Sequence, residues 1–126
     1  MTGGKSFSSR KLLGRHLDHA ESFFDGRLII TYETTEDTLT FGQNGRDSDA
    51  LYQNLLAIEG VEAIVNIKQE TPEQCTAGFR SRENVDVSVI AAHFGGGGHK
   101  NASGASCTTT IKEFIPQLLQ EFQKIF

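Results

Sequence analysis

The chain has 126 residues, a formal net charge of −4 and a hydrophobic content of 37%. This length suits one domain with a modest core. The acidic balance argues against a protein that holds long nucleic acids through its overall charge. No apolar run is long enough to cross a bilayer. Cys75 and Cys107 form no CxxC pattern and no signal peptide is evident, so a reducing, cytoplasmic location is expected.

The first part of the chain is predicted to hold a helix and a strand. Residues 1–8 are mostly small and polar, which is typical of a linker or an expression remnant, so the domain is placed at residues 9–126. Apolar residues recur at helical spacing from about Ser9 to Phe24 and predict a helix. Asp25-Gly26 predicts a turn, and the unbroken apolar run of Leu28–Tyr32 predicts a strand that is buried on both faces.

A loop and a second helix are predicted next. The polar segment Thr34–Arg46 is predicted as a loop that can hold a short helical turn. Asp47 or Ser48 can cap the following helix, and Gly60 suits the left-handed position after its end. The apolar side of this helix is predicted to consist of Leu51, Leu55 and Ile58.

A hairpin and a short helix follow. Val61–Ile67 and Cys75–Phe79 alternate between apolar and polar residues, which predicts two antiparallel strands. Asp86 can cap a short helix whose apolar stripe reaches Phe94, and Gly95 is expected to end it.

The C-terminal part is predicted to contain a strand and a final helix. The strand covers Ala102–Thr109, and Thr110 with Glu113 forms a capping-box pattern at the start of the helix. Pro116 is expected to kink this helix or to delay its regular start. The order α-β-α-β-β-α-β-α predicts an α/β fold, with a mixed β-sheet flanked by α-helices in a single domain.

Four consecutive glycines, Gly95–Gly98, connect the short helix to the following strand. A fold that orders such a run needs backbone conformations or close approaches that side chains forbid, and the N–H groups of the run can form a nest for an anion. His99 and Lys100 add charge, while Asn101 and Ser103 add neutral donors. The alternative is a plain flexible loop. A nucleotide-binding P-loop is excluded, because the required glycine and lysine spacing is absent.

Arg80 is the second candidate for a phosphate contact. Phe79 belongs to the apolar face of its strand, so Arg80 points to the opposite face, where Gly78 leaves room. A planar guanidinium beside a glycine nest can clamp a phosphate. The alternative is that Arg80 and Arg82 are solvated charges at the end of a strand.

No metal site is predicted in this chain. His16 and His19 lie one helical turn apart and could chelate a metal weakly. A third and a fourth ligand are not apparent, so a solvated helix face is the favoured interpretation.

Several motifs together resemble a known family. They are Gly78-Phe79-Arg80-Ser81, the segment Val85–Ala91, and the run from Phe94 to Gly104. On these residues the chain resembles the C-terminal, DHH-associated domain of the DHH phosphoesterases. It is most similar to the branch of small bacterial nanoRNases that also dephosphorylate 3′-phosphoadenosine 5′-phosphate. The resemblance covers nearly the whole chain.

The resemblance implies a two-domain enzyme. Its N-terminal domain holds two manganese ions, which activate a water for attack on phosphorus, and its C-terminal domain binds a short RNA or a bisphosphate nucleotide. Arg80 and His99 match the family's substrate-contacting positions, and Gly96, Gly97 and Gly98 match the loop that lets phosphate approach. The less supported neighbours are Ser81, Lys100 and Asn101.

The Asp-His-His motif that names the family is absent from this sequence, since Asp18-His19-Ala20 does not match it. No catalytic residue is therefore assigned, and the chain alone is expected to be inactive. Two alternatives stay open. The chain could be a non-catalytic nucleic-acid-binding module, as in the relatives from alanyl-tRNA synthetase, or it could be part of a cyclic-dinucleotide phosphodiesterase.

Overall fold

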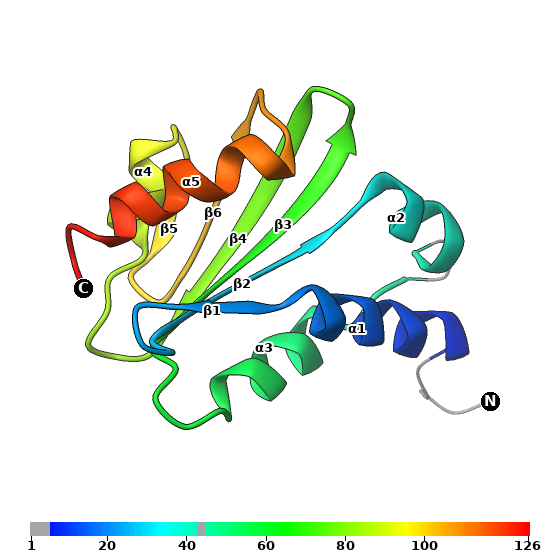
Figure 1. The fold of residues 1–126 in the computed structure, drawn as a ribbon, viewed down its shortest axis with the longest axis horizontal. Coiled ribbons are helices and arrows are strands. Elements are labelled where there is room, and N and C mark those ends of the chain that lie inside the picture. The colour runs from blue at the N-terminus through cyan, green and yellow to red at the C-terminus, as the bar shows by residue number, and fades with distance from the viewer. Residues whose placement is uncertain (1–5, 43–44) are drawn as a thin grey trace.

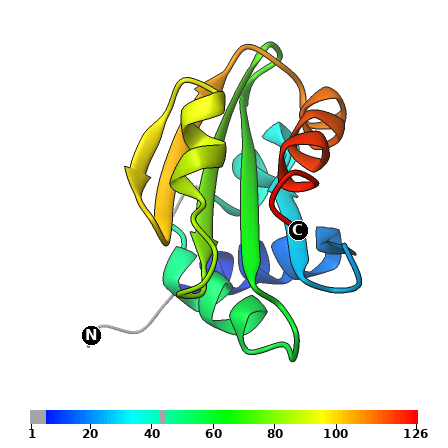
Figure 2. The same ribbon diagram turned by 90° about the vertical axis from the view of Figure 1, so that its left-hand side faces the viewer.

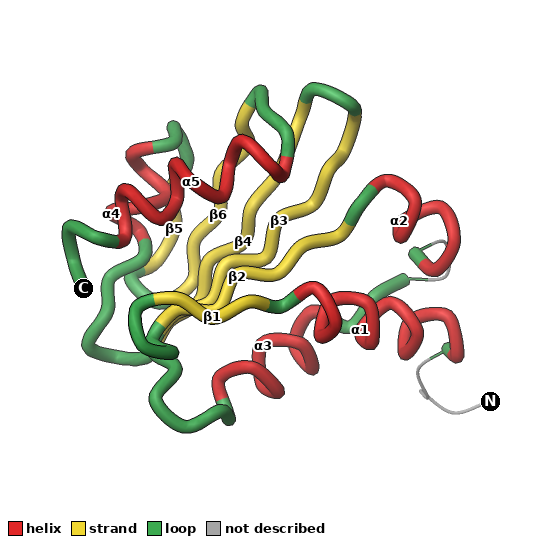
Figure 3. The backbone as a smooth tube through the Cα atoms, viewed as in Figure 1, coloured by secondary structure: helices red, strands yellow, loops and turns green. Residues whose placement is uncertain are grey.

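The computed structural model describes residues 6–42 and 45–126. The strands of this part of the chain are β1 (Glu21–Phe23), β2 (Leu28–Glu33), β3 (Ala63–Thr71), β4 (Gln74–Ser81), β5 (Gly97–His99) and β6 (Ala102–Cys107). The helices are α1 (Phe7–His19), α2 (Thr35–Phe41), α3 (Ser48–Leu56), α4 (Ser88–His93) and α5 (Ile111–Phe122). The strands form one sheet in the order β1-β2-β3-β4-β6-β5 (Figure 3).

The sheet is mixed, as predicted. Strands β2 and β3 run parallel, and every other neighbouring pair is antiparallel. Figure 1 shows α4 and α5 together on one side of the sheet, with α1 and α3 on the other. The predicted single-domain α/β fold is therefore confirmed. None of the helices in the described residues is long and apolar enough to pass through a membrane.

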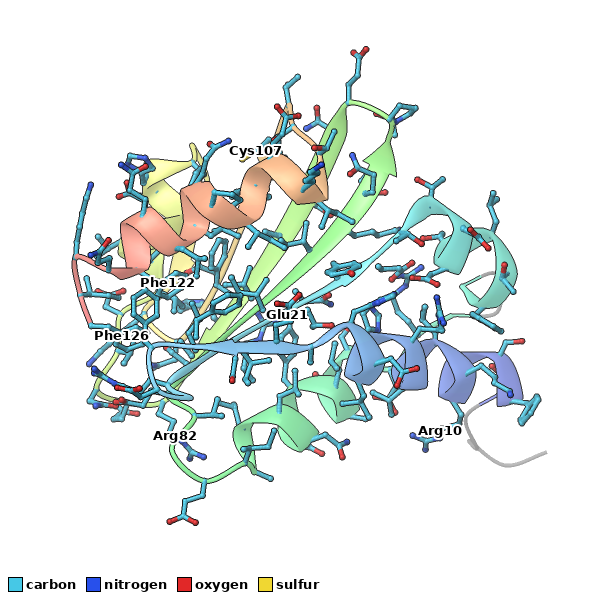
Figure 4. All side chains as sticks on the ribbon, in the orientation of Figure 1. Arg10, Glu21, Arg82, Cys107, Phe122 and Phe126 are labelled. Atoms are coloured by element: carbon cyan, nitrogen blue, oxygen red, sulfur yellow. The ribbon has the colours of Figure 1, made fainter. Side chains whose placement is uncertain are left out.

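Two buried clusters hold the helices to the sheet. The larger lies under α4 and α5, where Phe79 of β4 packs with Phe114 and Phe122 of α5. Figure 4 shows Phe122 on the sheet side of α5. The smaller cluster joins Leu51 and Leu55 of α3 to Ile64 of β3 on the opposite face. Burial of such side chains is the main favourable term in folding, at about 25 cal/mol per Å² of apolar surface.

Several local signals act as predicted. Asp47 caps α3 by accepting a hydrogen bond from the Ala50 N–H at 3.0 Å. Thr110 caps α5 in the same way by accepting from the Glu113 N–H at 3.3 Å. Gly60 has the expected left-handed conformation, with a φ of +88°, but it does not end the helix, because α3 stops at Leu56 and Ala57 is its cap. Helix α5 starts ahead of Pro116 and continues through it, so the proline does not delay the start.

The predicted helix over Ser9–Phe24 is wrong at its end. Helix α1 stops at His19, because Ala20 is extended with φ −64° and ψ 131°, and Glu21–Phe23 pairs with β2 as strand β1. The hairpin turn forces Phe24 and Asp25 to positive φ angles. At the other end, Phe7 and Ser8 form the first turn of α1, although the prediction assigned them to a linker. Residues 1–5 of that linker lie outside the described residues.

The segment predicted as a loop over Thr34–Arg46 contains the full helix α2. Thr34 and Asp37 form a capping box, which starts the helix. The Gln43-Asn44 part of the prediction lies outside the described residues. Gly42 ends α2, and its N–H donates to the Thr38 carbonyl at 2.8 Å.

The prediction of a solvated face for His16 and His19 is wrong. His16 is buried, and its Nε2 lies 3.4 Å from Oε1 of the buried Glu33, which Arg46 also contacts. His19 Nε2 lies 3.0 Å from Oδ2 of Asp37. The two histidines therefore face two different carboxylates. Both contacts join α1 to segments that follow it by more than ten residues, a relation that helical spacing within α1 cannot reveal.

The two cysteines lie in strands, as predicted. Cys75 and Cys107 face each other across β4 and β6, and both thiols are free. Cys75 is fully buried, as expected for a core residue, and burial raises the pKa of its thiol to about 11. Cys107 is only partly buried.

Acid should weaken the fold through Asp37. Burial alone would raise the pKa of this carboxyl. Hydrogen bonds from the Thr34 N–H, Arg15 and His19 more than offset that effect and lower the pKa from 3.8 to about 2. Because the folded-state pKa is depressed, the carboxylate is expected to stabilise the fold by about 2 kcal/mol above pH 4. That contribution is lost as the pH falls from about 4 to about 2.

Urea unfolding at pH 5 and pH 2 checks this expectation. The parent chain should lose about 2 kcal/mol more unfolding free energy than the Asp37→Asn variant over this interval. Equal losses in the two chains would contradict the assignment, since other carboxyls titrate in both.

Candidate functional site

The register of the sheet brings two predicted phosphate contacts into one row. Arg80 of β4 lies directly opposite Ala102 of β6, and Ala102 lies directly opposite His99 of β5. Residues that face each other across strands project from the same side of a sheet. Arg80 and His99, here called the cationic row, therefore stand two strands apart, about 10 Å between strand axes. The strand register thus places both residues on one side of the sheet, and their role as substrate contacts stays a prediction.

The cationic row borders an open face of the sheet. Helices α1 and α3 lie over β2 and β3 on this side, while α4 contacts β5 and β6 from the side of the larger core. Figure 2 shows β5 at the margin of the molecule with α4 beside it. The open face is defined here as the side of β4, β6 and β5 that carries Arg80. His99 and Gly97 are exposed there.

Three of the four glycines have a structural reason, and the fourth has none. Gly95 has a φ of +81° and ends α4, as predicted. A side chain on Gly96 would lie 2.0 Å from the Gly104 carbonyl, so this glycine allows close contact with β6. Gly98 has a φ of +145°, and a side chain there would lie 2.7 Å from the Ala102 carbonyl. Gly97 is different, because a side chain there would meet nothing within 4 Å.

The segment predicted as a loop is therefore largely a strand. Gly97–His99 pairs with β6 as the edge strand β5, and Lys100-Asn101 forms the turn between them. The nest hypothesis also needs correction. The N–H groups of Gly95 and Gly96 donate to carbonyls at the end of α4, at 3.0 and 2.8 Å. The helix cap thus uses the N–H groups at the start of the run, and open space lies over Gly97, where a side chain would meet nothing within 4 Å.

Arg80 is held in place by a residue that sequence reasoning missed. Its guanidinium carbon lies 4.5 Å from the centre of the Tyr52 ring, and its Nη1 donates to the Phe79 carbonyl at 2.9 Å. Within the part of the chain that the structure describes, no carboxylate pairs with Arg80. A half-buried arginine that is stacked and has no acidic partner can offer its remaining donors to an anion.

The sequence suggested that Gly78 leaves room for a ligand beside Arg80, but the structure shows no such room. A side chain on Gly78 would lie 2.5 Å from the Tyr52 hydroxyl, so the space is filled by that tyrosine. Tyr52 comes from α3, and burial raises the pKa of its hydroxyl. The contact joins residues 26 positions apart. The one signal in the sequence for this contact was that Tyr52, an aromatic residue, directly follows Leu51, which was predicted on the apolar side of the helix.

Ser81 and Asn101 are hydrogen-bonded to each other and do not reach the open face. Ser81 is buried on the Phe79 side of the sheet, and its hydroxyl donates to the Val85 carbonyl at 2.6 Å. The Asn101 side-chain amide donates to Ser81 Oγ at 3.0 Å and to the Arg82 carbonyl at 2.6 Å. Lys100 is exposed in the adjoining turn. The roles of these three residues as substrate contacts stay predictions.

Arg82 has a structural partner rather than a solvated position. Its Nε donates to the Val61 carbonyl at 2.7 Å, and its guanidinium also contacts the Leu56 carbonyl. Figure 4 shows Arg82 near the end of α3. Among residues 6–42 and 45–126, no group of three or more histidine, cysteine, aspartate or glutamate side chains could hold a metal ion.

Comparison with known proteins gives one family match and several structural matches. The model of the DHHA1 domain matches residues 26–126. No curated protein sequence matches the chain. An exopolyphosphatase-related protein from Bacteroides fragilis is 25% identical, with a TM-score of 0.84 over 98% of this chain and 37% of its own.

Two further structures are similar in fold alone. A pGpG-specific phosphodiesterase from Vibrio cholerae has a TM-score of 0.61 at 11% identity, over 89% of this chain and 37% of its own. A Helicobacter pylori protein of uncharacterized function has a TM-score of 0.54 at 18% identity, over 90% of this chain and 31% of its own. The chain thus spans 31–37% of the length of these three structures.

Proposed function

Because the chain belongs to the DHHA1 domain family, we propose that it is the substrate-binding part of a DHH phosphoesterase and that its open face holds a substrate phosphate. The observation that carries the proposal is the cationic row, in which Arg80 and His99 share one face of the sheet beside the unobstructed backbone of Gly97. Arg80 supplies planar, charged donors and His99 supplies ring nitrogens.

The proposed substrates are short oligoribonucleotides, 3′-phosphoadenosine 5′-phosphate, or both. The resemblance at Arg80 and at Gly96–Asn101 supports this choice. The chain's negative net charge of −4 also favours small substrates over long nucleic acids. The chemistry itself is assigned to an N-terminal DHH domain, with manganese ions that activate a water. The role of this chain is to bind and orient, and it is proposed to be inactive alone. We place the protein in the cytoplasm, in keeping with its two free thiols.

Gly97→Val tests the proposal, because this substitution fills the open face without disturbing the fold. Gly97 has no positive φ and no neighbour that a side chain would meet, and valine suits an edge strand. We expect the variant to unfold at the same urea concentration as the parent and to bind adenosine 3′,5′-bisphosphate at least about tenfold more weakly. Isothermal titration of both chains measures the affinities. Equal affinity would show that phosphate does not bind at Gly97.

A further inference from the structure

Tyr52 of α3 lies against β4 on the side that carries Arg80, and it contacts both Gly78 and Arg80. The centre of its ring lies 4.5 Å from the guanidinium carbon of Arg80. A side chain on Gly78 would lie 2.5 Å from the Tyr52 hydroxyl and 3.8 Å from Cζ of the ring, so only glycine leaves space for the hydroxyl here. Tyr52 is 8% exposed and packs in the smaller buried cluster. It is therefore a fixed surface beside Arg80.

The Tyr52 hydroxyl stays neutral, and its neighbours keep the ring in one place. Asn66 of β3 lies directly opposite Gly78, on the side of the sheet that Tyr52 covers. Burial raises the pKa of the Tyr52 hydroxyl more than the charge of Arg80 and a hydrogen bond with Asn66 lower it. The hydroxyl therefore remains protonated near neutral pH, and the ring presents an uncharged π face to the guanidinium.

Arg80 has few other contacts that could fix its side chain. Its Nη1 donates to the carbonyl of the adjacent Phe79 at 2.9 Å. Among residues 6–42 and 45–126, no ion pair includes Arg80. Ile64 and Ala102 lie opposite it on the two neighbouring strands, and their side chains cannot accept a hydrogen bond. When binding has to immobilise such a long side chain, affinity falls by about two- to tenfold.

We infer that Tyr52 is a positioning residue for the substrate phosphate, because its ring holds the Arg80 guanidinium in the binding orientation before the substrate arrives. This inference rests on the proposed function and adds to it the residue that prepares Arg80. Tyr52 raises the affinity without touching the phosphate, since Arg80 is already ordered in the free chain. Gly78 has a part in the same arrangement, because it leaves the space that the Tyr52 hydroxyl occupies.

Isothermal titration of the Tyr52→Leu variant with adenosine 3′,5′-bisphosphate tests the inference. We expect binding about two- to tenfold weaker than in the parent chain. In the Arg80→Ala background, Tyr52→Leu should cause no further loss, whereas a general loosening of the fold would weaken binding in both backgrounds. The ¹⁵N relaxation of Arg80 Nε in the ligand-free chain should change from rigid to mobile. Leu51→Ala is the matched control, because it truncates a buried residue of the same helix and cluster, and it should change neither readout.

Gly78→Ala gives a second test that keeps the ring and does not depend on the folding of Tyr52→Leu. The added methyl group would displace the Tyr52 hydroxyl, so we expect binding weaker by about two- to tenfold. Tyr52→Phe alone should bind nearly as well as the parent, since the ring face beside Arg80 remains. Gly78→Ala combined with Tyr52→Phe should regain most of the lost affinity, because the atom then nearest to the methyl group is Cζ, at 3.8 Å.

The outcomes separate the inference from the proposed function. If Tyr52→Leu binds the nucleotide as tightly as the parent, or if Arg80 Nε is equally mobile in both chains, Tyr52 does not position Arg80, although the phosphate site stands. If Gly78→Ala binds weakly and Tyr52→Phe does not restore the affinity, the position of the Tyr52 ring is not what Gly78 controls, and the inference is wrong. If the parent chain binds no nucleotide, or if its binding does not depend on Arg80, the proposed function fails and the inference fails with it.

Discussion

Arg80→Ala is expected to weaken nucleotide binding by roughly ten- to a hundredfold, because a hydrogen bond to a charged group contributes about 1.5–3 kcal/mol. Arg80 is stacked on Tyr52 and pairs with no carboxylate in the described part of the chain. Its charge is therefore available and its position is fixed. Arg80→Lys should restore only part of the affinity, since lysine lacks the planar two-donor fork. Titration of each variant with adenosine 3′,5′-bisphosphate measures the loss.

Lys112→Ala is the control for the change in charge, because Lys112 is exposed on α5, on the other side of the sheet. It should leave the affinity unchanged. Combining Arg80→Ala with His99→Ala should cost less than the sum of the two single losses if both side chains hold one phosphate. Unchanged affinity in Arg80→Ala would show that the site has been assigned to the wrong face.

Gly96→Ala is expected to lower the free energy of unfolding by about 1–3 kcal/mol, the usual cost of forcing atoms into a packed place. A side chain on Gly96 would lie 2.7 Å from the Ala105 Cα and closer still to the Gly104 carbonyl, so β5 would have to separate from β6. The neighbouring Gly97→Ala should change the unfolding free energy by less than about 0.5 kcal/mol. Urea unfolding of both variants measures the difference.

This pair of variants separates two explanations for the glycine run. A freely moving loop would accept alanine at both positions with equal ease. Equal stabilities of Gly96→Ala and Gly97→Ala would therefore contradict the paired strand β5 and the close contact between β5 and β6.

The sequence predicted those parts of the fold that depend on local signals. The caps at Asp47 and Thr110 and the alternation of the β3–β4 hairpin each arise within a few residues. The side of β4 from which Arg80 projects, opposite Phe79, was also predictable, whereas the position of His99 depends on strand β5, which was predicted as a loop.

The elements that were missed depend on contacts between residues distant in sequence, or on pairing with a neighbouring strand rather than on the strand propensity of their own residues. Strand β5 is mostly glycine, which has no preference for strands, and it exists because β6 supplies its hydrogen-bonding partners. The contact of Tyr52 with Gly78 and Arg80 joins a helix to a strand that follows it much later. The same is true of His16 and Glu33, whose pairing buries a histidine that helical periodicity placed in solvent.

The most direct test of the central claim is to titrate the uniformly ¹⁵N-labelled chain with adenosine 3′,5′-bisphosphate and follow its backbone amide signals. The open face is predicted to respond, with saturable shifts at Gly97, His99 and Gly104 and at the Arg80 side chain. Helix α5, on the opposite side, should be unaffected. Saturable shifts confined to α4 and α5, or none at any position at millimolar nucleotide, would contradict a phosphate site on the open face.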